Sequence, residues 1–268
     1  MKLIAAIRTF FASIFIPGWG YWIVGKRRYG LVTVAALVTL ALIVSWTRLI
    51  LYPVGYYSLL FCVFLPLIGT AVHAASIEVR NKNTQRNWKH AFLFAVPCLL
   101  VMFLLFSNRG VTLGYEIYRL PAQSMVPTLL EGDYIIVDTW RYRSADPANG
   151  DIVVFALPGS GVNYIKRIAG VPGDSVSLLS NRLSRNGRLV DEPYVTYDGP
   201  ARPYHALPEQ TVSAGHYILL GDNRNNSRDS RHFGAIPREN LVGGVSHVFF
   251  SSDNETGIRW HRIPTQFD

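Results

Sequence analysis

Several residue types are scarce in this chain of 268 residues, and each shortage excludes a class of protein. Charged residues make up only 16% of the sequence, against about 25% in ordinary soluble domains, which excludes a disordered chain and favours a membrane protein. The two cysteines both lie in apolar runs, so the polar part has neither a disulfide scaffold nor a cysteine-ligated zinc site. No two histidines have metal-ligand spacing, and we expect no metal and no cofactor.

Acidic residues are nearly absent from the first 114 residues, where Glu78 is the only one beside 11 Lys and Arg, giving a formal charge of +10. Residues 115–268 hold 17 acidic residues and 15 Lys and Arg, which gives −2. The net charge of +8 therefore belongs to the apolar half. A nucleic-acid-binding protein would carry its basic patch on the polar domain, so we expect no nucleic acid among the partners.

Long apolar runs in the first half predict membrane spans. Arg48 is the only charged residue from Leu31 to Ile77, and this run exceeds two spans of about 20 residues each. The turn residues Tyr52 to Gly55 divide the run, and a further apolar run contains Pro97. We therefore expect an α-helical membrane region over residues 1–107, with spans at about 31–47, 56–76 and 91–107.

The apolar stretch 9–25 is interrupted by Pro17 and Gly18, and it is interpretable as a fourth span or as an interfacial or re-entrant segment. Basic residues flank it on both sides and also fill the loop 78–90. Because positive charge marks the cytoplasmic side, charge favours the second interpretation, with a cytoplasmic N-terminus and residues 108–268 on the outer face. A cleaved signal peptide is disfavoured, since the segment lacks an Ala-x-Ala site.

The second half predicts an all-β domain over residues 108–268. No stretch of ten or more residues has a convincing helical period, and short alternating runs are separated by turn residues. Asn186 and Gly187, between two leucines, are a strong hairpin signal. The expected strands are 117–120, 134–139, 152–157, 164–169, 176–179, 216–220, 245–250 and 257–261.

Three polar segments stand out as candidates for chemistry. Ser124 lies between Pro121 and Pro127, which restrict the backbone on both sides of a candidate nucleophile. Lys166 is the single lysine of residues 115–268, beside 14 arginines, and it lies in an expected strand. A buried lysine can lose its charge and accept a proton from a hydroxyl, whereas arginine cannot. Taken singly, a rigid turn and an isolated surface lysine explain these residues as well.

The third segment, residues 221–231, follows an expected strand and is dense in hydrogen-bonding side chains. One interpretation is an ordinary solvated loop. The other is a loop that positions a base, in which Ser227 hydrogen-bonds the Lys166 amine while Asp229 and Arg231 brace the loop.

Together the segments resemble the bacterial type I signal peptidases. The matching motifs are Ser-Met-x-Pro-Thr-Leu at 124–129, Gly-Asp-Ile-Val-Val-Phe at 150–155, Tyr-Ile-Lys-Arg-Ile-Ala-Gly-x-Pro-Gly-Asp at 164–174 and Gly-Asp-Asn-Arg-x-Asn-Ser-x-Asp-Ser-Arg at 221–231. They occur in the family's order and cover most of residues 117–240, and Asp191 to Tyr194 also look like the family. The resemblance does not extend to residues 1–90.

The resemblance implies a β fold like that of LexA-type repressors and a Ser-Lys dyad. Ser124 matches the nucleophile, Lys166 the general base and Ser227 the hydroxyl that orients the lysine amine. Asp229 and Arg231 match the supporting ion pair. The residues that match the lining of the substrate pockets, or stand beside the nucleophile, are Leu120, Met125, Ile135, Val154, Tyr164 and Ile165.

The implied function is a membrane-bound serine endopeptidase of the bacterial cytoplasmic membrane. It would remove signal peptides from exported preproteins after small residues, in contact with membrane lipid, and its oligomeric state is left open. Two alternatives remain: a maturation peptidase for pilin-like or conjugation substrates, and an inactive scaffold that binds signal peptides. Ala122 supports the scaffold, because relatives often carry there a serine whose hydroxyl joins the oxyanion hole. A Ser-His-Asp site with His205 or His232 is disfavoured, since neither histidine lies in a motif.

Overall fold

The computed structural model describes residues 2–80, 88–157, 159–198, 206–253, 255 and 257–267. The chain divides into two compact units, Met1–Gly114 and Tyr115–Asp268. The expected boundary after residue 107 falls just before a short helix, Arg109–Thr112, that is part of the first unit. His205 and most of the basic loop 78–90 lie outside the described residues.

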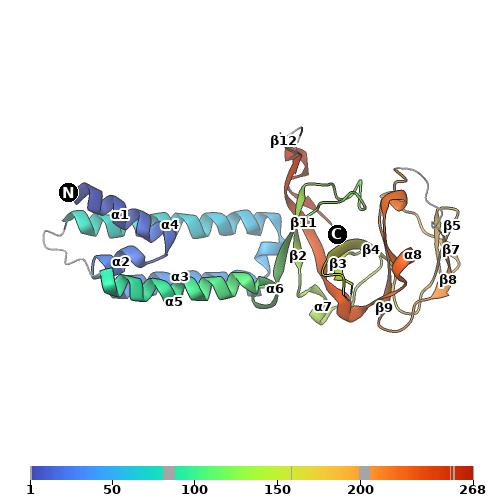
Figure 1. The fold of residues 1–268 in the computed structure, drawn as a ribbon, viewed down its shortest axis with the longest axis horizontal. Coiled ribbons are helices and arrows are strands. Elements are labelled where there is room, and N and C mark those ends of the chain that lie inside the picture. The colour runs from blue at the N-terminus through green and yellow to red at the C-terminus, as the bar shows by residue number, and fades with distance from the viewer. Residues whose placement is uncertain are drawn as a thin grey trace. The chain divides into compact units, whose positions relative to one another are not determined.

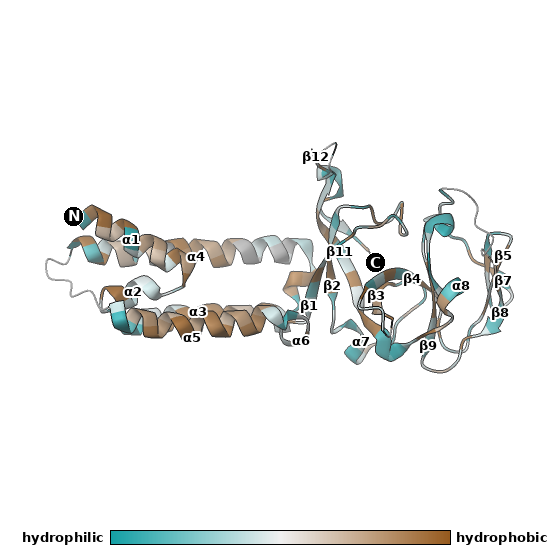
Figure 2. Cartoon of the chain, in the orientation of Figure 1, coloured by the Kyte–Doolittle hydropathy of each residue, from teal (hydrophilic) through white to brown (hydrophobic). Residues whose placement is uncertain are grey.

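The first unit is helical. Helices α3 and α5 each contain 20 residues, which at about 1.5 Å per residue matches the roughly 30 Å of a bilayer core. Figure 2 shows the apolar residues along both of them. In the described part of the chain, three stretches are long and apolar enough to cross a membrane: Arg27–Trp46, Phe61–Arg80 and Trp88–Ser107. The helices are α1 (Lys2–Phe15), α2 (Trp19–Ile23), α3 (Arg27–Trp46), η1 (Leu49–Leu51), α4 (Pro53–Arg80), α5 (Trp88–Ser107) and α6 (Arg109–Thr112).

Residues 9–25 belong to a helical hairpin. Helix α1 ends before Pro17 and Gly18, and Gly18 has a φ of 80°, so the chain turns back into α2 (Figure 1). Gly20 permits close packing of the two helices, because a Cβ at this position would lie 2.0 Å from the Ser13 Oγ. On its other side α2 packs on α5, where the Trp22 ring stacks on Phe94 with centroids 4.6 Å apart. The segment is thus two short helices and not one continuous span.

The second unit is built from antiparallel strands, as expected for an all-β domain. Among its described residues the α-helices are two single turns, α7 (Arg141–Ser144) and α8 (Ser230–Phe233). The strands are β1 (Tyr115–Arg119), β2 (Asp133–Asp138), β3 (Ile152–Ala156), β4 (Asn163–Gly170), β5 (Ser175–Leu179), β6 (Arg182–Arg185), β7 (Arg188–Leu189), β8 (Leu207–Thr211), β9 (His216–Leu220), β10 (Ile236–Pro237), β11 (Leu241–Asp253), β12 (Gly257–Ile258) and β13 (Thr265–Gln266).

Two sheets make up this unit (Figure 1). The larger has the order β1-β2-β11-β3-β4-β9-β10, with β12 and β13 also paired to β11, and the smaller has the order β7-β6-β5-β8. Side chains on opposite faces of β4 enter different clusters: Ile165 packs against the cluster that includes Val154, whereas Ile168 joins Phe155. Strand β4 therefore lies between two buried layers, which is the setting of Lys166.

Local sequence signals explain the hairpin but not every strand. Asn186 and Gly187 both have positive φ, 54° and 74°, and join β6 to β7 as their dipeptide predicts. Strand β8 was not expected from the sequence, because Leu-Pro-Glu-Gln-Thr carries a proline and a charge. It is an edge strand of the smaller sheet, where a missing N–H and a charged side chain are tolerated.

Candidate active site

Ser124 lies in a turn between β1 and β2, partly exposed. Two main-chain hydrogen bonds fix this turn: Leu129 N–H donates to Met125 O at 2.9 Å, and Asn223 N–H donates to Ser124 O at 3.1 Å. Within the described residues, the Ser124 main-chain N–H has no hydrogen-bond partner. This N–H is therefore available to an oxygen that develops negative charge beside the Ser124 hydroxyl.

Lys166 lies in the middle of β4, which pairs with β3 on one side and β9 on the other. Its side chain is buried, with only 3% of the residue exposed. The Nζ atom is 2.8 Å from the Ser124 Oγ and 2.8 Å from the Ile165 carbonyl oxygen. The sheet thus places the Lys166 amine at hydrogen-bond distance from the Ser124 hydroxyl, although the two residues are 42 positions apart in the sequence.

Burial governs the charge of this amine. It lowers the pKa of Lys166 from 10.5 to about 8, because the ammonium form loses its hydration inside the protein. The carboxylates of Asp229 and Asp222 act in the opposite direction, and the Arg231 guanidinium adds to the lowering. An amine with this pKa is partly neutral near physiological pH and can accept a proton.

The loop after β9 is held by the Asp229 carboxylate, which is fully buried. It forms a two-point ion pair with Arg231, with N–O distances of 2.8 and 2.7 Å, and accepts the Gly221 N–H at 2.9 Å. Burial by itself raises the pKa of Asp229, but the hydrogen bonds and charge of Arg231 outweigh it, so the pKa lies below its ordinary value. The carboxylate therefore stays ionised and ties the loop together.

Ser227 has a different partner from the one expected. Its hydroxyl donates to the Asp229 carboxylate at 2.7 Å, while the hydrogen bonds of Lys166 go to Ser124 and Ile165. The expected hydrogen bond from Ser227 to the Lys166 amine is not formed. A buried carboxylate is a stronger acceptor than a neutral amine, so the hydroxyl turns toward Asp229. Ser227 still lies beside the site, since a Cβ on Gly221 would touch both its Oγ and the Ser124 carbonyl oxygen.

Five of the six residues expected at the substrate pockets lie together. They pack in one hydrophobic cluster next to the Ser124 turn: Leu120, Met125, Ile135, Val154 and Ile165. Tyr164 does not join them. It packs with Phe155 and Phe233 in a different cluster, because it is one residue before Ile165 on β4 and points to the other face of the sheet.

Three polar residues that the sequence did not single out also brace the site. Arg167, next to Lys166, forms a two-point ion pair with Asp222, with N–O distances of 2.9 and 2.7 Å. The Thr128 hydroxyl, from the Ser124 turn, donates to the same carboxylate. All three residues belong to the motifs at 124–129, 164–174 and 221–231, so the sequence did contain a signal for them. Their contact could not be foreseen, because Thr128 and Asp222 are 94 positions apart in the chain.

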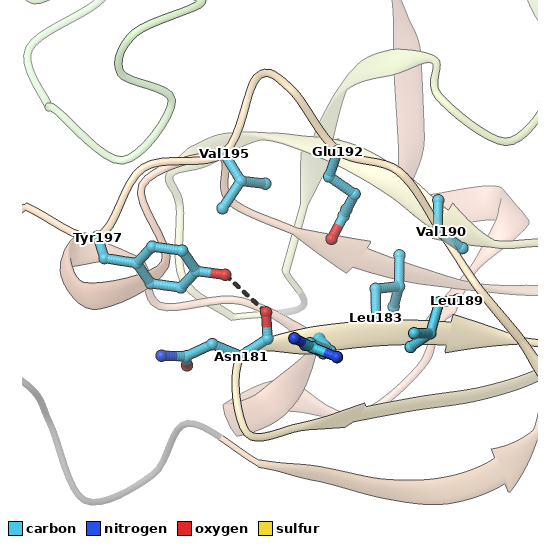
Figure 3. A pocket seen from close by; sticks show the side chains of 8 residues that line it. Asn181, Leu183, Leu189, Val190, Glu192, Val195 and Tyr197 are labelled. Carbon is cyan, nitrogen blue, oxygen red and sulfur yellow. Dashed lines mark hydrogen bonds between the residues drawn. The ribbon is translucent and has the colours of Figure 1, made fainter.

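A hollow of moderate size lies in the same unit, and the described residues contain no metal-binding cluster. In the described part of the chain, no three His, Cys, Asp or Glu side chains gather as metal ligands. A hollow of about 270 Å³ lies between the β6–β7 hairpin and residues 192–197. Figure 3 shows Glu192 and Val195 on one side of it and Leu183 and Leu189 on the other. Ala122, in the Ser124 turn, is exposed and provides no side-chain donor.

A family model described as signal peptidase, peptidase S26, matches residues 86–250, which include every motif above. The chain belongs to this family. Probable signal peptidase I-2 of Synechocystis sp. is 41% identical over 134 residues, which are 48% of this chain and 60% of that protein. Probable signal peptidase I-1 of the same organism is 33% identical, covering 63% of this chain and 85% of that protein. Signal peptidase I of Pseudomonas fluorescens is 34% identical, covering 56% and 69%.

The S26 match defines which part of the chain carries the family's features. It begins near the start of α5 and ends within β11, so α1 to α4 lie outside it. Of the three relatives, the first is matched over less than two thirds of its length. The Ser124 turn, β4 and the 221–231 loop are all inside the S26 region.

Proposed function

We propose that this chain is a membrane-bound serine endopeptidase that removes N-terminal signal peptides from exported preproteins after small residues. Ser124 is the nucleophile and Lys166 the general base. One observation carries the assignment: the Lys166 Nζ lies 2.8 Å from the Ser124 Oγ, and the amine is buried. A hydroxyl and a desolvated amine in this arrangement form an activated nucleophile without a histidine.

The reaction follows from this geometry. Lys166 takes the proton of the Ser124 hydroxyl as the Oγ bonds to the scissile carbonyl carbon. The carbonyl oxygen becomes an oxyanion and accepts the free Ser124 N–H. The C–N bond then breaks, the Lys166 ammonium returns its proton to the leaving amine, and an ester remains on Ser124. Water attacks the ester with Lys166 again as base, and the Ser124 hydroxyl is restored.

The substrate is recognised beside the Ser124 turn. Strand β4 and the turn present the buried cluster of Leu120, Met125, Ile135, Val154 and Ile165 next to the dyad. Packed apolar side chains of this kind accept small residues and reject large ones, because enlarging the space would open the core. This supports cleavage after small residues, with Tyr164 outside the recognition surface.

The helical unit supports a place in the bacterial cytoplasmic membrane. The three candidate spans run from Arg27, from Phe61 and from Trp88, and the basic residues gather at the ends of the helices around Arg27 and Arg80. By the positive-inside rule, the N-terminus and the loop 78–90 are cytoplasmic, and an odd number of spans places the β unit on the outer face. The apolar surfaces of α3 and α5 then contact membrane lipid.

Cleavage of a preprotein with an Ala-x-Ala site by the detergent-solubilised chain tests the function. Wild type is compared with Lys166→Arg, which keeps the charge but cannot act as a base. We expect the variant to lose at least about 10³-fold in rate, the order expected for a missing base. Lys89→Arg is the matched control, because Lys89 is exposed at the start of α5, and it should cut like wild type.

Each outcome of this experiment supports a different hypothesis. Cleavage by wild type and not by Lys166→Arg supports the dyad and shows that Ala122 is tolerated. Cleavage by both proteins contradicts the role of Lys166. If neither cuts this preprotein, pilin-like substrates are tried next, and failure on these favours the inactive scaffold.

A further inference from the structure

A short strap, residues Glu192–Tyr197, backs the loop that carries Asn223. Thr196 N–H donates to Asp222 O at 2.9 Å, and Arg224 N–H donates to Thr196 O at 2.8 Å, so strap and loop pair like strands. The loop in turn contacts the nucleophile, because Asn223 N–H donates to Ser124 O at 3.1 Å. A displacement of the strap would therefore move the loop, and the loop would move the Ser124 turn to which it is hydrogen-bonded.

On the side of the β6–β7 hairpin, the strap is held by a hydrogen bond from the Tyr197 hydroxyl to the Asn181 carbonyl oxygen at 2.7 Å. The hollow of about 270 Å³ lies directly beneath it, so Val195 and Glu192 have open space on the side of the β6–β7 hairpin (Figure 3). A side chain next to empty space loses contacts on that side. The charged connections of the strap lie on the side of the 221–227 loop.

A buried ion pair provides the first connection. The Arg224 Nη2 lies 2.6 Å from the Glu192 Oε1, and the two side chains are 2% and 9% exposed. The Arg224 Nε also donates to the Gly221 carbonyl oxygen at 3.0 Å. Glu192 thus fixes the side chain that holds the first residue of the loop.

Tyr194 provides the second connection. Its hydroxyl donates to the same Glu192 oxygen at 3.1 Å, and the Arg167 guanidinium lies over its ring at 3.9 Å from the centroid. Such a cation–π contact is favourable when the cation is desolvated, and the Arg167 side chain is only 14% exposed. Arg167 then pairs with Asp222 of the loop. These contacts link five residues, Glu192, Tyr194, Arg167, Asp222 and Arg224, and the main chain from Asp222 to Arg224 closes them into a ring, which we call the strap ring.

We propose that Glu192 and Tyr194 are positioning residues, which hold Lys166 and the 221–227 loop in register with Ser124 through the strap ring. This inference rests on the proposed function, in which Ser124 and Lys166 are the catalytic residues. Arg167 follows Lys166 directly in β4, so a shift of one backbone moves the other. Glu192 and Tyr194 touch neither reacting atom; they act through Arg224 and Arg167.

Charge removal at one member of the ring is the first test. Glu192→Gln keeps the shape of the side chain but leaves the buried Arg224 charge uncompensated, so the loop shifts. We expect kcat for preprotein cleavage to fall roughly 10- to 100-fold with KM changed less than about twofold, as for a small misplacement of reacting groups. Glu209→Gln is the matched control, because Glu209 is an exposed carboxylate of β8 in the same unit, and it should leave kcat and KM unchanged.

A second, milder variant keeps the proposal testable if Glu192→Gln does not fold. Tyr194→Phe keeps the ring under Arg167 and removes only the hydroxyl that donates to Glu192. We expect kcat to fall about 2- to 10-fold, since one member of a network is lost while the rest remains. Both variants are assayed well below their unfolding temperatures. A lower unfolding temperature with unchanged kcat would show a merely structural role and overturn the proposal.

The pH dependence of Lys166 labelling separates this inference from the proposed function. Acetic anhydride labels neutral amines, and the peptide with Lys166 is identifiable by mass because residues 115–268 have no other lysine. We expect Glu192→Gln to move the Lys166 labelling pKa upward by about 0.5–1 unit, as a loosened loop admits water. If wild type cuts preproteins and both kcat and labelling are unchanged in Glu192→Gln, positioning fails. If wild type does not cut but labelling shifts, the proposed function fails and positioning stands.

Discussion

At the scale of single residues, the proposed chemistry depends on the identity of one amine. Lysine is used once among the described residues of the β unit, and there it is buried to 3% exposure at hydrogen-bond distance from a serine. An arginine at the same position would keep its proton at any working pH. The 14 arginines of the same half serve the tasks in which a permanent charge is useful, such as the pair of Arg231 with Asp229.

The pKa of Lys166 predicts the pH profile. Only the neutral amine accepts a proton, and its fraction rises with pH until the pKa of about 8 is passed. We expect kcat/KM to rise about tenfold per pH unit well below this value and to level off above it.

The measurement is preprotein cleavage across pH 6 to about 9.5, with His232→Gln as control. The control should retain the same profile, because His232 is exposed on α8. A change of the profile in the His232 variant would point to a histidine base instead.

At the scale of elements, two loops meet beside an internal strand of the larger sheet. Strand β4 carries Lys166, and the turn after β1 carries Ser124. The loop after β9 contacts the turn through Asn223 and contacts β4 through the ion pair of Asp222 with Arg167. Gly221, at the start of the loop, lies against the Ser124 turn. Its missing side chain leaves room for the Ser227 hydroxyl and the Ser124 carbonyl oxygen, which a Cβ would meet at 2.1 and 2.7 Å.

Gly221→Ala should therefore cost more in activity than an ordinary glycine substitution. Contacts below 3 Å force the Ser124 turn and the loop apart, and we expect a loss of about 1–3 kcal/mol in stability with a fall of roughly 10²-fold in kcat.

Gly215→Ala is the comparison. Gly215 has a φ of 70° but nothing within 4 Å of an added Cβ, so we expect about 1 kcal/mol of strain with kcat retained. Urea unfolding and cleavage rates measure both effects. Equal activities for the two variants would refute close approach at Gly221 as a requirement.

At the scale of the whole molecule, charge is divided between a basic helical unit and a slightly acidic β unit. Near the ends of α4 and α5 lie Arg80 and Lys89, and the start of α3 adds Arg27 and Arg28. Cationic residues at one end of a set of spans fix orientation during insertion. The proposed topology depends on this asymmetry and on the hairpin of α1 and α2 not crossing the membrane.

Labelling with a membrane-impermeant maleimide checks the topology. After replacement of Cys62 and Cys98 by serine, a single cysteine is placed at Lys89 or at the exposed Arg228 of the β unit. We expect intact cells to label the Arg228→Cys protein and to leave the Lys89→Cys protein unlabelled. Permeabilised cells should label both, which controls for reactivity. Labelling of Lys89→Cys in intact cells would reverse the orientation.

The sequence by itself determined those features that depend on neighbours in the chain. The apolar runs predicted the helices of the first unit, and Asn186 with Gly187 predicted the hairpin that β6 and β7 form. The four motifs predicted the family and pointed to Ser124 and Lys166. Each of these signals is complete within a few residues, because helix hydropathy, turn φ values and motif spacing are local properties.

Only the tertiary structure decided which distant groups meet. Ser227 turned out to donate to Asp229 and not to Lys166, Tyr164 lies on the opposite face from the pocket cluster, and Glu192 reaches Arg224 from 32 positions away. Each outcome is a competition among partners brought together by sheet order and burial. A buried charge takes the strongest acceptor or donor within reach, and reach is set by the fold rather than by spacing in the chain.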